Sequence, residues 1–252
     1  MDFLNNYKSL CTEFYDIDKP FAPEDALSYF LNEANSSVQP VLEPMCGSGR
    51  FLIPVLEAGI NIEGSDASAE MLESCKNKCR DHKLNPVLYY QKIQELLLPQ
   101  KYGMVFIPSG SFGLITDSDD ARESLKRIHR CLLPEGKLLI EIETPAAVVH
   151  EESENVREAV LNRDSRIILT SVTRYDIKAN IETIDCRYEK FQSDVLVKSE
   201  TESIKVRHYT LSEFKDLLKS AGFSVISSER PYSGQTATED DEMVLFKAGF
   251  SS

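Results

Sequence analysis

The chain has 252 residues and a mass of 28.5 kDa, enough to bury a core without disulfides or a metal. Lysine and arginine number 28 against 41 aspartates and glutamates, so the formal net charge is −13. Phosphate backbones and anionic lipid surfaces repel such a chain, which disfavours nucleic acid and membranes as main partners. No apolar run approaches the roughly 18 residues of a membrane span, and the acidic, proline-containing residues 1–25 do not resemble a secretory leader. We therefore expect a cytoplasmic protein.

The first 150 residues predict two helices followed by alternating strands and helices. Residues 1–37 have a helical pattern that Pro20 and Pro23 divide in two. The predicted strands are 40–43, 60–66, 87–91, 104–108 and 137–143, and the predicted helices between them are 50–58, 69–82 and 119–133. A turn is predicted at residues 134–136, before the fifth strand. This alternation predicts a Rossmann-like sheet, seven-stranded and mostly parallel, with helices on both faces.

The pattern changes in the second half of the chain. Within residues 166–207, apolar and polar side chains alternate with a period of two, which predicts antiparallel strands with a turn at 178–180. A capped helix follows, and strands at 223–228 and 243–248 complete the main sheet. We therefore divide the chain into an N-terminal helical cover (1–37), a Rossmann-like cofactor-binding domain (38–150 and 208–252) and an inserted antiparallel β-layer (151–207) that covers the substrate.

The chemically informative segment follows the first predicted strand. That strand ends in Glu43, and the turn after it contains Gly47 and Gly49 before a helix begins. Because glycine has no Cβ, a ligand can approach the backbone of such a turn closely. The second predicted strand ends in Asp66, where a carboxylate can accept hydrogen bonds from both hydroxyls of a ribose. The combination predicts a cofactor that contains adenosine.

Two residues bear on which cofactor this is. A dinucleotide site has a third glycine where this chain has Leu52, and its pyrophosphate would meet the negative charge of Glu43. The sulfonium and ammonium groups of S-adenosylmethionine suit that carboxylate. We therefore expect S-adenosylmethionine, with S-adenosylhomocysteine as product, and keep an NAD(P)-dependent oxidoreductase as the alternative that these residues disfavour.

At these motifs the chain resembles the class I S-adenosylmethionine-dependent methyltransferases, and most of all their bacterial small-molecule branch. The resemblance runs from about residue 15 to about residue 246. The stretches that carry it, in family order, are 43–50, 64–68 with 71–72, 92–94, 106–112, 133–137, and 208–210 with 221–223.

The resemblance implies which residues bind the cofactor. They are Glu43, Met45, Cys46, Gly47, Ser48, Gly49, Asp66, Ala67, Met71, Ile93, Gln94 and Pro108. Ala67 and Met71 would flank the adenine, the backbone N–H of Ile93 would contact it, and Pro108 would line the methyl-donor side. The sequence departs from the family at Met45, where glycine is frequent, and at Lys92, where an acid is usual. Lysine cannot accept the adenine amino hydrogens.

The expected reaction is an in-line displacement at the methyl group, which depends mainly on holding the acceptor in position. The sequence nominates no catalytic base. The Asn/Asp-Pro-Pro-Tyr signature of enzymes that methylate nucleic-acid bases is absent, so we expect a small-molecule acceptor. The residues expected to contact it are Tyr15, Ser109, Arg174, Arg187, Tyr188 and Tyr209.

The protein is expected to be a monomer or homodimer. Cys75, Cys79 and His82 share one face of a predicted helix, but no fourth ligand has a matching spacing, so we expect no metal site. A protein that binds S-adenosylmethionine without turning it over remains an alternative to the enzyme.

Overall fold

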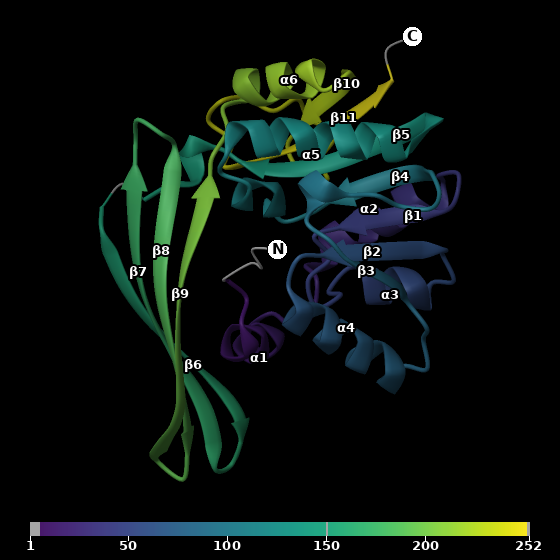
Figure 1. Ribbon diagram of the computed structural model, residues 1–252. Coiled ribbons are helices and arrows are strands. Elements are labelled where there is room, and N and C mark those ends of the chain that lie inside the picture. Colours follow the sequence, from purple (N-terminus) through teal and green to yellow (C-terminus); the bar gives the residue numbers. More distant parts are fainter. Residues whose placement is uncertain (1–5, 150, 251–252) are drawn as a thin grey trace.

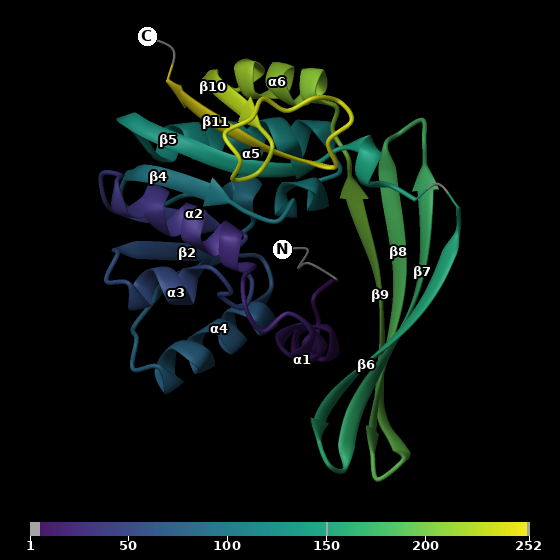
Figure 2. The ribbon, with the colours of Figure 1, turned by 180° about the vertical axis from the view of Figure 1, so that it is seen from behind.

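The computed structural model describes residues 6–149 and 151–250, which form two separate β-sheets and the helices around them (Figures 1 and 2). The larger sheet has seven strands in the order β10-β11-β5-β4-β1-β2-β3. Its strands are β1 (Val41–Pro44), β2 (Ile62–Asp66), β3 (Val87–Tyr90), β4 (Tyr102–Ile107), β5 (Leu132–Glu143), β10 (Phe223–Glu229) and β11 (Met243–Phe250). The helices are α1 (Ser9–Asp18), α2 (Glu24–Asn35), α3 (Leu52–Glu57), α4 (Ala69–Asp81), α5 (Ser118–Cys131) and α6 (Leu211–Ser220), with 3₁₀ turns η1 (Ile93–Glu95), η2 (Ser111–Leu114) and η3 (Pro145–Ala147).

The larger sheet confirms the predicted mostly parallel, Rossmann-like architecture. Strands β1 to β5 pair in parallel, whereas β11 runs antiparallel to β5, and β10 antiparallel to β11. Every residue of β1 and β4 is buried, because helices cover both faces of the sheet. Helices α2, α3 and α4 pack on one face, and α5 and α6 pack on the other.

The turn predicted at residues 134–136 is wrong, because these residues lie inside β5. Helix α5 ends at Cys131 and the strand begins at the next residue. The pairing of β4 with β5 shifts between Tyr102↔Leu132 and Met104↔Lys137, so the extra residues of β5 form a bulge. A bulge leaves residues unpaired, which is why a proline without an N–H and a glycine are tolerated within this strand.

The smaller sheet is an antiparallel β-layer with the strand order β6-β7-β8-β9. Its strands are β6 (Ser153–Asn162), β7 (Ser165–Asp176), β8 (Ile181–Gln192) and β9 (Val195–Arg207). The predicted turn at 178–180 lies between β7 and β8, as expected. Strand β6 was not predicted, because residues 153–158 are all exposed and show no half-buried alternation.

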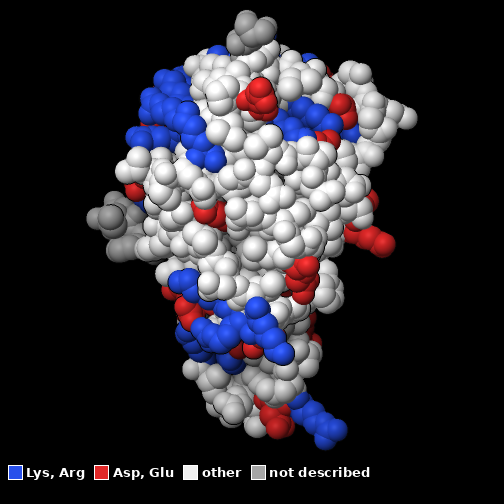
Figure 3. Space-filling view, turned by 90° about the vertical axis from the view of Figure 1, so that its right-hand side faces the viewer, with Lys and Arg blue, Asp and Glu red and all other residues white. Residues whose placement is uncertain are grey.

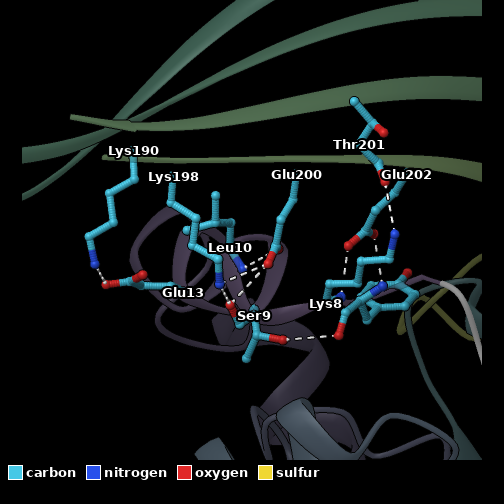
Figure 4. Close-up of polar contacts among 11 residues, drawn as sticks. Lys8, Ser9, Leu10, Glu13, Lys190, Lys198, Glu200, Thr201 and Glu202 are labelled. Carbon is cyan, nitrogen blue, oxygen red and sulfur yellow. Dashed lines mark hydrogen bonds and ion pairs between the residues drawn. The ribbon is translucent and has the colours of Figure 1, made fainter. Parts of the chain in front are cut away.

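Helix α1 lies between the β-layer and the larger sheet (Figures 1 and 2). Its apolar side chains Leu10 and Phe14 pack against Ile167 and Leu169 of the layer. Two carboxylates of β9 bind the amino end of the helix: Glu202 accepts hydrogen bonds from the backbone N–H groups of Tyr7 and Lys8, and Glu200 accepts one from that of Leu10 (Figure 4). These bonds supply the cap that the residue before the helix, Lys8, does not provide.

The surface carries charges of both signs. On the face shown in Figure 3, lysines and arginines form separate groups divided by uncharged surface and by acidic side chains. Among the described residues, no helix is long and apolar enough to span a bilayer.

Candidate cofactor and acceptor site

A cavity of about 410 Å³ opens at the carboxyl ends of the parallel strands, where open α/β sheets bind ligands. Eight segments of the chain line it: the N-terminal segment, the loops after β1, β2, β3 and β4, the start of α4, the start of α5, and β9. The lining residues are Asn6, Tyr7, Tyr15, Met45, Gly47, Asp66, Ala67, Met71, Gln91, Lys92, Ile93, Gln94, Ser111, Leu114, Ile115, Thr116, Asp117, Asp120, Ser203 and Lys205.

The turn after β1 presents its backbone to this cavity at Met45 and Gly47. Both residues have left-handed backbones, with φ +59° at Met45 and +53° at Gly47. A Cβ added to Gly47 would meet only the sulfur of Met71, at 4.0 Å, so space is left open there. A left-handed backbone costs a side-chain-bearing residue about 1 kcal/mol, which explains why the family often has glycine where Met45 stands.

Gly49 has a different role from Gly47. Its backbone is also left-handed, with φ +87°, but an added Cβ would lie 2.6 Å from the sulfur of Cys75 and 3.0 Å from the side chain of Ile53. The glycine therefore lets the turn pack closely against α3 and α4 and does not line the cavity. Of the two glycines, only Gly47 lines the cavity, and its contact with a ligand stays a prediction.

Asp66, the last residue of β2, both contacts the turn and lines the cavity. One of its carboxylate oxygens accepts a hydrogen bond from the N–H of Gly47 and the other accepts one from the N–H of Ser68, both at 2.8 Å. Each oxygen keeps a second lone pair for another donor. Burial raises the pKa of Asp66 above its ordinary value, although the backbone hydrogen bonds oppose the shift. The two backbone hydrogen bonds thus fix the orientation of the carboxylate at the cavity lining.

Glu43 lies at the end of β1, buried behind the turn, and does not line the cavity. One of its carboxylate oxygens has no hydrogen-bond partner. Burial raises the pKa of Glu43 well above its ordinary value, against the opposing charge of Arg50. A cationic ligand in the neighbouring cavity would stabilise the ionised carboxylate, which fits the sulfonium and ammonium groups of S-adenosylmethionine.

The loop after β3 also lines the cavity. Ile93 is buried at the start of η1, and Gln94 donates a 3.2 Å hydrogen bond from its side chain to Asp120 of α5. The structure thus gathers seven of the twelve predicted cofactor residues around one cavity: Met45, Gly47, Asp66, Ala67, Met71, Ile93 and Gln94. It does not bring Glu43, Cys46, Ser48, Gly49 or Pro108 to the lining.

Of the predicted substrate residues, Tyr15 alone lines the cavity. Ser109 follows β4 and accepts a hydrogen bond from Arg50. The other four lie away from the lining: Arg174 pairs with Asp185, Arg187 lies 3.9 Å from Glu189, Tyr188 donates to the sulfur of Cys11, and Tyr209 packs against Phe112 and Phe214. The β-layer reaches the cavity through Ser203 and Lys205 of β9 instead.

Several lining residues were not predicted, among them Asn6, Tyr7, Asp117, Ser203 and Lys205. The alternation of β9 places Ser203 and Lys205 on one face of the layer, but the sequence does not say which face meets the sheet domain. Tyr7 has a left-handed backbone, with φ +57°, just before α1, a position that helical periodicity does not reveal. Within the described residues, no three His, Cys, Asp or Glu side chains are grouped to hold a metal ion.

Comparisons with known proteins agree with this arrangement. Residues 41–136 match the methyltransferase domain family. The protein named "Putative methyltransferase YqeM" of Bacillus subtilis (strain 168) is 23% identical over 236 residues, covering 93% of each chain. A solved S-adenosylmethionine-dependent methyltransferase from Clostridium acetobutylicum superposes with a TM-score of 0.79 at 18% identity, covering 95% of this chain and 97% of that one. The sugar N-methyltransferase KedS8 from a Streptoalloteichus species gives a TM-score of 0.74 at 14% identity, covering 95% and 92%.

Proposed function

We propose that this chain is a class I S-adenosylmethionine-dependent methyltransferase that methylates the nitrogen of a small-molecule amine. One observation carries the cofactor assignment: the carboxylate of Asp66 and the open backbone of Gly47 meet at one cavity, joined by a 2.8 Å hydrogen bond. Nitrogen is proposed because the similar structure KedS8 is a sugar N-methyltransferase.

Different residues around the cavity bind different parts of the cofactor. Asp66 accepts the ribose hydroxyls, Ala67 and Met71 enclose the adenine with Ile93, and the turn at Gly47 receives the methionine end. Lys92 lines the cavity where an acid is usual, so the adenine amino group relies on the loop backbone there. When bound, S-adenosylmethionine supplies an activated methyl group that the acceptor displaces in line. The protein contributes position and exclusion of water, and forms no covalent bond to either ligand.

Helix α1 and the β-layer serve as the cover of this site. Tyr7 and Tyr15 enter the cavity from the N-terminal segment, and Ser203 and Lys205 enter it from β9. Because Glu200 and Glu202 of β9 hold the amino end of α1, the helix and the layer form one continuous wall. We assign the substrate-covering role to this wall as a whole.

Calorimetry with S-adenosylhomocysteine tests the cofactor site. Asp66→Asn keeps the size of the side chain but loses the charge, and should weaken binding by about 1.5–3 kcal/mol. NAD serves as the comparison ligand and should not bind. Unchanged affinity of Asp66→Asn for S-adenosylhomocysteine would contradict the assignment. A screen of amines with S-adenosylmethionine then separates an enzyme from a protein that binds the cofactor without turnover.

A further inference from the structure

An unpaired guanidinium lies beside the proposed cofactor cavity. Arg50 follows the glycine turn, and one terminal nitrogen of its side chain donates a 2.9 Å hydrogen bond to the hydroxyl of Ser109. Its Nε is buried and has no hydrogen-bond partner. Among the described residues, no carboxylate lies within 4 Å of this side chain to form an ion pair. The side chain is only partly buried and lies near the rings of Tyr15 and Phe51, but its enclosed Nε–H is left unsatisfied, and an unsatisfied buried donor points to a ligand that rearranges or completes this group.

A second cation approaches the same place. The ammonium of Lys19 lies 5.7 Å from the centre of the Tyr15 ring, and the guanidinium carbon of Arg50 lies 5.8 Å from it. Lys19 also forms no ion pair within the described part of the chain. The surrounding protein and the positive charge of Arg50 lower the pKa of Lys19, although part of its side chain is open to solvent. Two cations thus face one aromatic ring in a chain whose net charge is −13.

The nearby carboxylates act on this pair electrostatically, Glu43 and Glu141 on Arg50 and Asp18 and Glu143 on Lys19, but among the described residues none forms an ion pair with either cation. Glu141 accepts hydrogen bonds from the N–H of Ser109 and the hydroxyl of Tyr232. Glu43 is buried under the turn. Glu143 influences the pKa of Lys19 but forms no ion pair with it or with Arg50 among the described residues.

The position of the pair fits an acceptor site. Tyr15 lines the cofactor cavity, and Ser109 directly follows the proposed methyl-donor segment at the end of β4. A molecule held by Arg50 and Lys19 would therefore lie against Tyr15, next to the cavity and at the carboxyl ends of the strands.

We propose that the acceptor carries a carboxylate, which binds between Arg50 and Lys19 over the edge of Tyr15. The planar guanidinium can match a carboxylate with two parallel N–H donors. This inference rests on the proposed function and narrows its substrate class to amines that also bear a carboxylate, such as amino acids.

Binding of the anion is tested apart from catalysis. Acetate is titrated into the full chain saturated with S-adenosylhomocysteine. The Nε–H resonance of Arg50 is followed by ¹H–¹⁵N NMR. This resonance is assigned by its absence from the spectrum of Arg50→Lys. We expect a saturable shift with acetate, none with methylammonium, and an affinity about fivefold lower in Lys19→Gln. Arg80→Gln, at an exposed position on α4, is the matched control and should bind acetate as the wild type does. No saturable shift with acetate would overturn the proposal.

The second test measures methylation of acceptors with and without a carboxylate. β-Alanine and 4-aminobutyrate are compared as acceptors with their amides, which keep the amine and lose the charge. We expect kcat/KM at least about tenfold higher for the carboxylates, a preference that Arg50→Gln removes. Equal rates for acids and amides would overturn the carboxylate site and leave the proposed function standing. Acetate binding at Arg50 without methylation of any amine would leave the site standing and contradict the proposed function.

Discussion

The hydroxyl of Ser48 donates a 2.6 Å hydrogen bond to the carboxylate of Asp16, which joins the glycine turn of the sheet domain to helix α1. Lys78 of α4 donates to the same carboxylate oxygen at 2.8 Å and to Ser48 at 3.0 Å, and Ser74 donates to the other oxygen. Asp16 lies one residue beyond Tyr15, which lines the cavity. Ser48, a predicted cofactor residue that does not line the cavity, therefore links the turn to α1.

Replacing Asp16 by Ala should loosen this cover. We expect binding of S-adenosylhomocysteine to weaken about fivefold, since a lost charge-assisted hydrogen bond is worth about 1–2 kcal/mol at a partly exposed site. Calorimetry on Asp16→Ala, Ser48→Ala and the double variant gives the coupling between the two residues. Asp81→Ala, exposed at the end of α4, is the control. Strictly additive effects of the two single substitutions would show that the link does not act on binding.

The two glycines of the turn should respond differently to alanine. Gly49→Ala places a Cβ against Cys75 and Ile53 at a left-handed position, and should lower the free energy of unfolding by about 3 kcal/mol. Gly47→Ala meets no close atom and should cost about 1 kcal/mol of stability, while its methyl group fills space that the ligand needs. Urea denaturation measures the first effect. Calorimetry measures the effect of Gly47→Ala on ligand binding. Normal binding of S-adenosylhomocysteine by this variant would mean that the methionine end of the cofactor does not lie at Gly47.

Glu33 of α2 should make stability depend on pH. Burial alone would raise its pKa, but the ammonium groups of Lys137 and Lys247 outweigh burial and lower it. A carboxyl whose pKa is lowered on folding stabilises the folded state above its unfolded pKa, and this contribution is lost as the pH falls through the folded pKa. Glu33→Gln should therefore cost about 1–2 kcal/mol at pH 7 and progressively less below about pH 4. Urea denaturation across this range, with exposed Glu73→Gln as control, checks the difference.

Glu43 should show the opposite dependence. Because burial raises its pKa, ionising the carboxyl in the folded chain lowers stability, and this effect grows as the pH rises from the unfolded pKa towards the raised one. Glu43→Gln should therefore stabilise the ligand-free protein by about 1–2 kcal/mol at neutral pH, with the gain vanishing near pH 4.

Ligand binding by Glu43→Gln tests whether this carboxylate serves the cofactor. The product S-adenosylhomocysteine lacks the sulfonium charge of S-adenosylmethionine. We expect the substitution to weaken the binding of S-adenosylmethionine about threefold more than the binding of S-adenosylhomocysteine, because it removes a negative charge near the sulfonium. Equal weakening of both ligands in calorimetry would mean that Glu43 does not sense the sulfonium.

Local patterns in the sequence were enough to predict the main sheet and the centre of its site. The buried runs of β1 and β4 and the amphipathic helices between strands carry their own periodicity, so the parallel architecture follows from them. Asp66 ends β2 and Gly47 follows β1, so their geometry depends on one strand–turn–helix–strand unit whose two parallel strands pair directly. The cofactor class follows from the same short segment.

What depends on packing between distant segments was decided only by the tertiary structure. Gly49 and Gly47 are alike in sequence, and only the neighbouring Cys75 shows that one serves packing. The face of β9 that meets the cavity, through Lys205 and Ser203, is set by how the layer docks on α1. The alternation of side chains along a strand defines two faces but does not say which of them is buried. The pairing of Ser48 with Asp16, 32 residues apart, likewise exists only once α1 lies over the turn, because a side-chain hydrogen bond requires a proximity that no sequence spacing encodes.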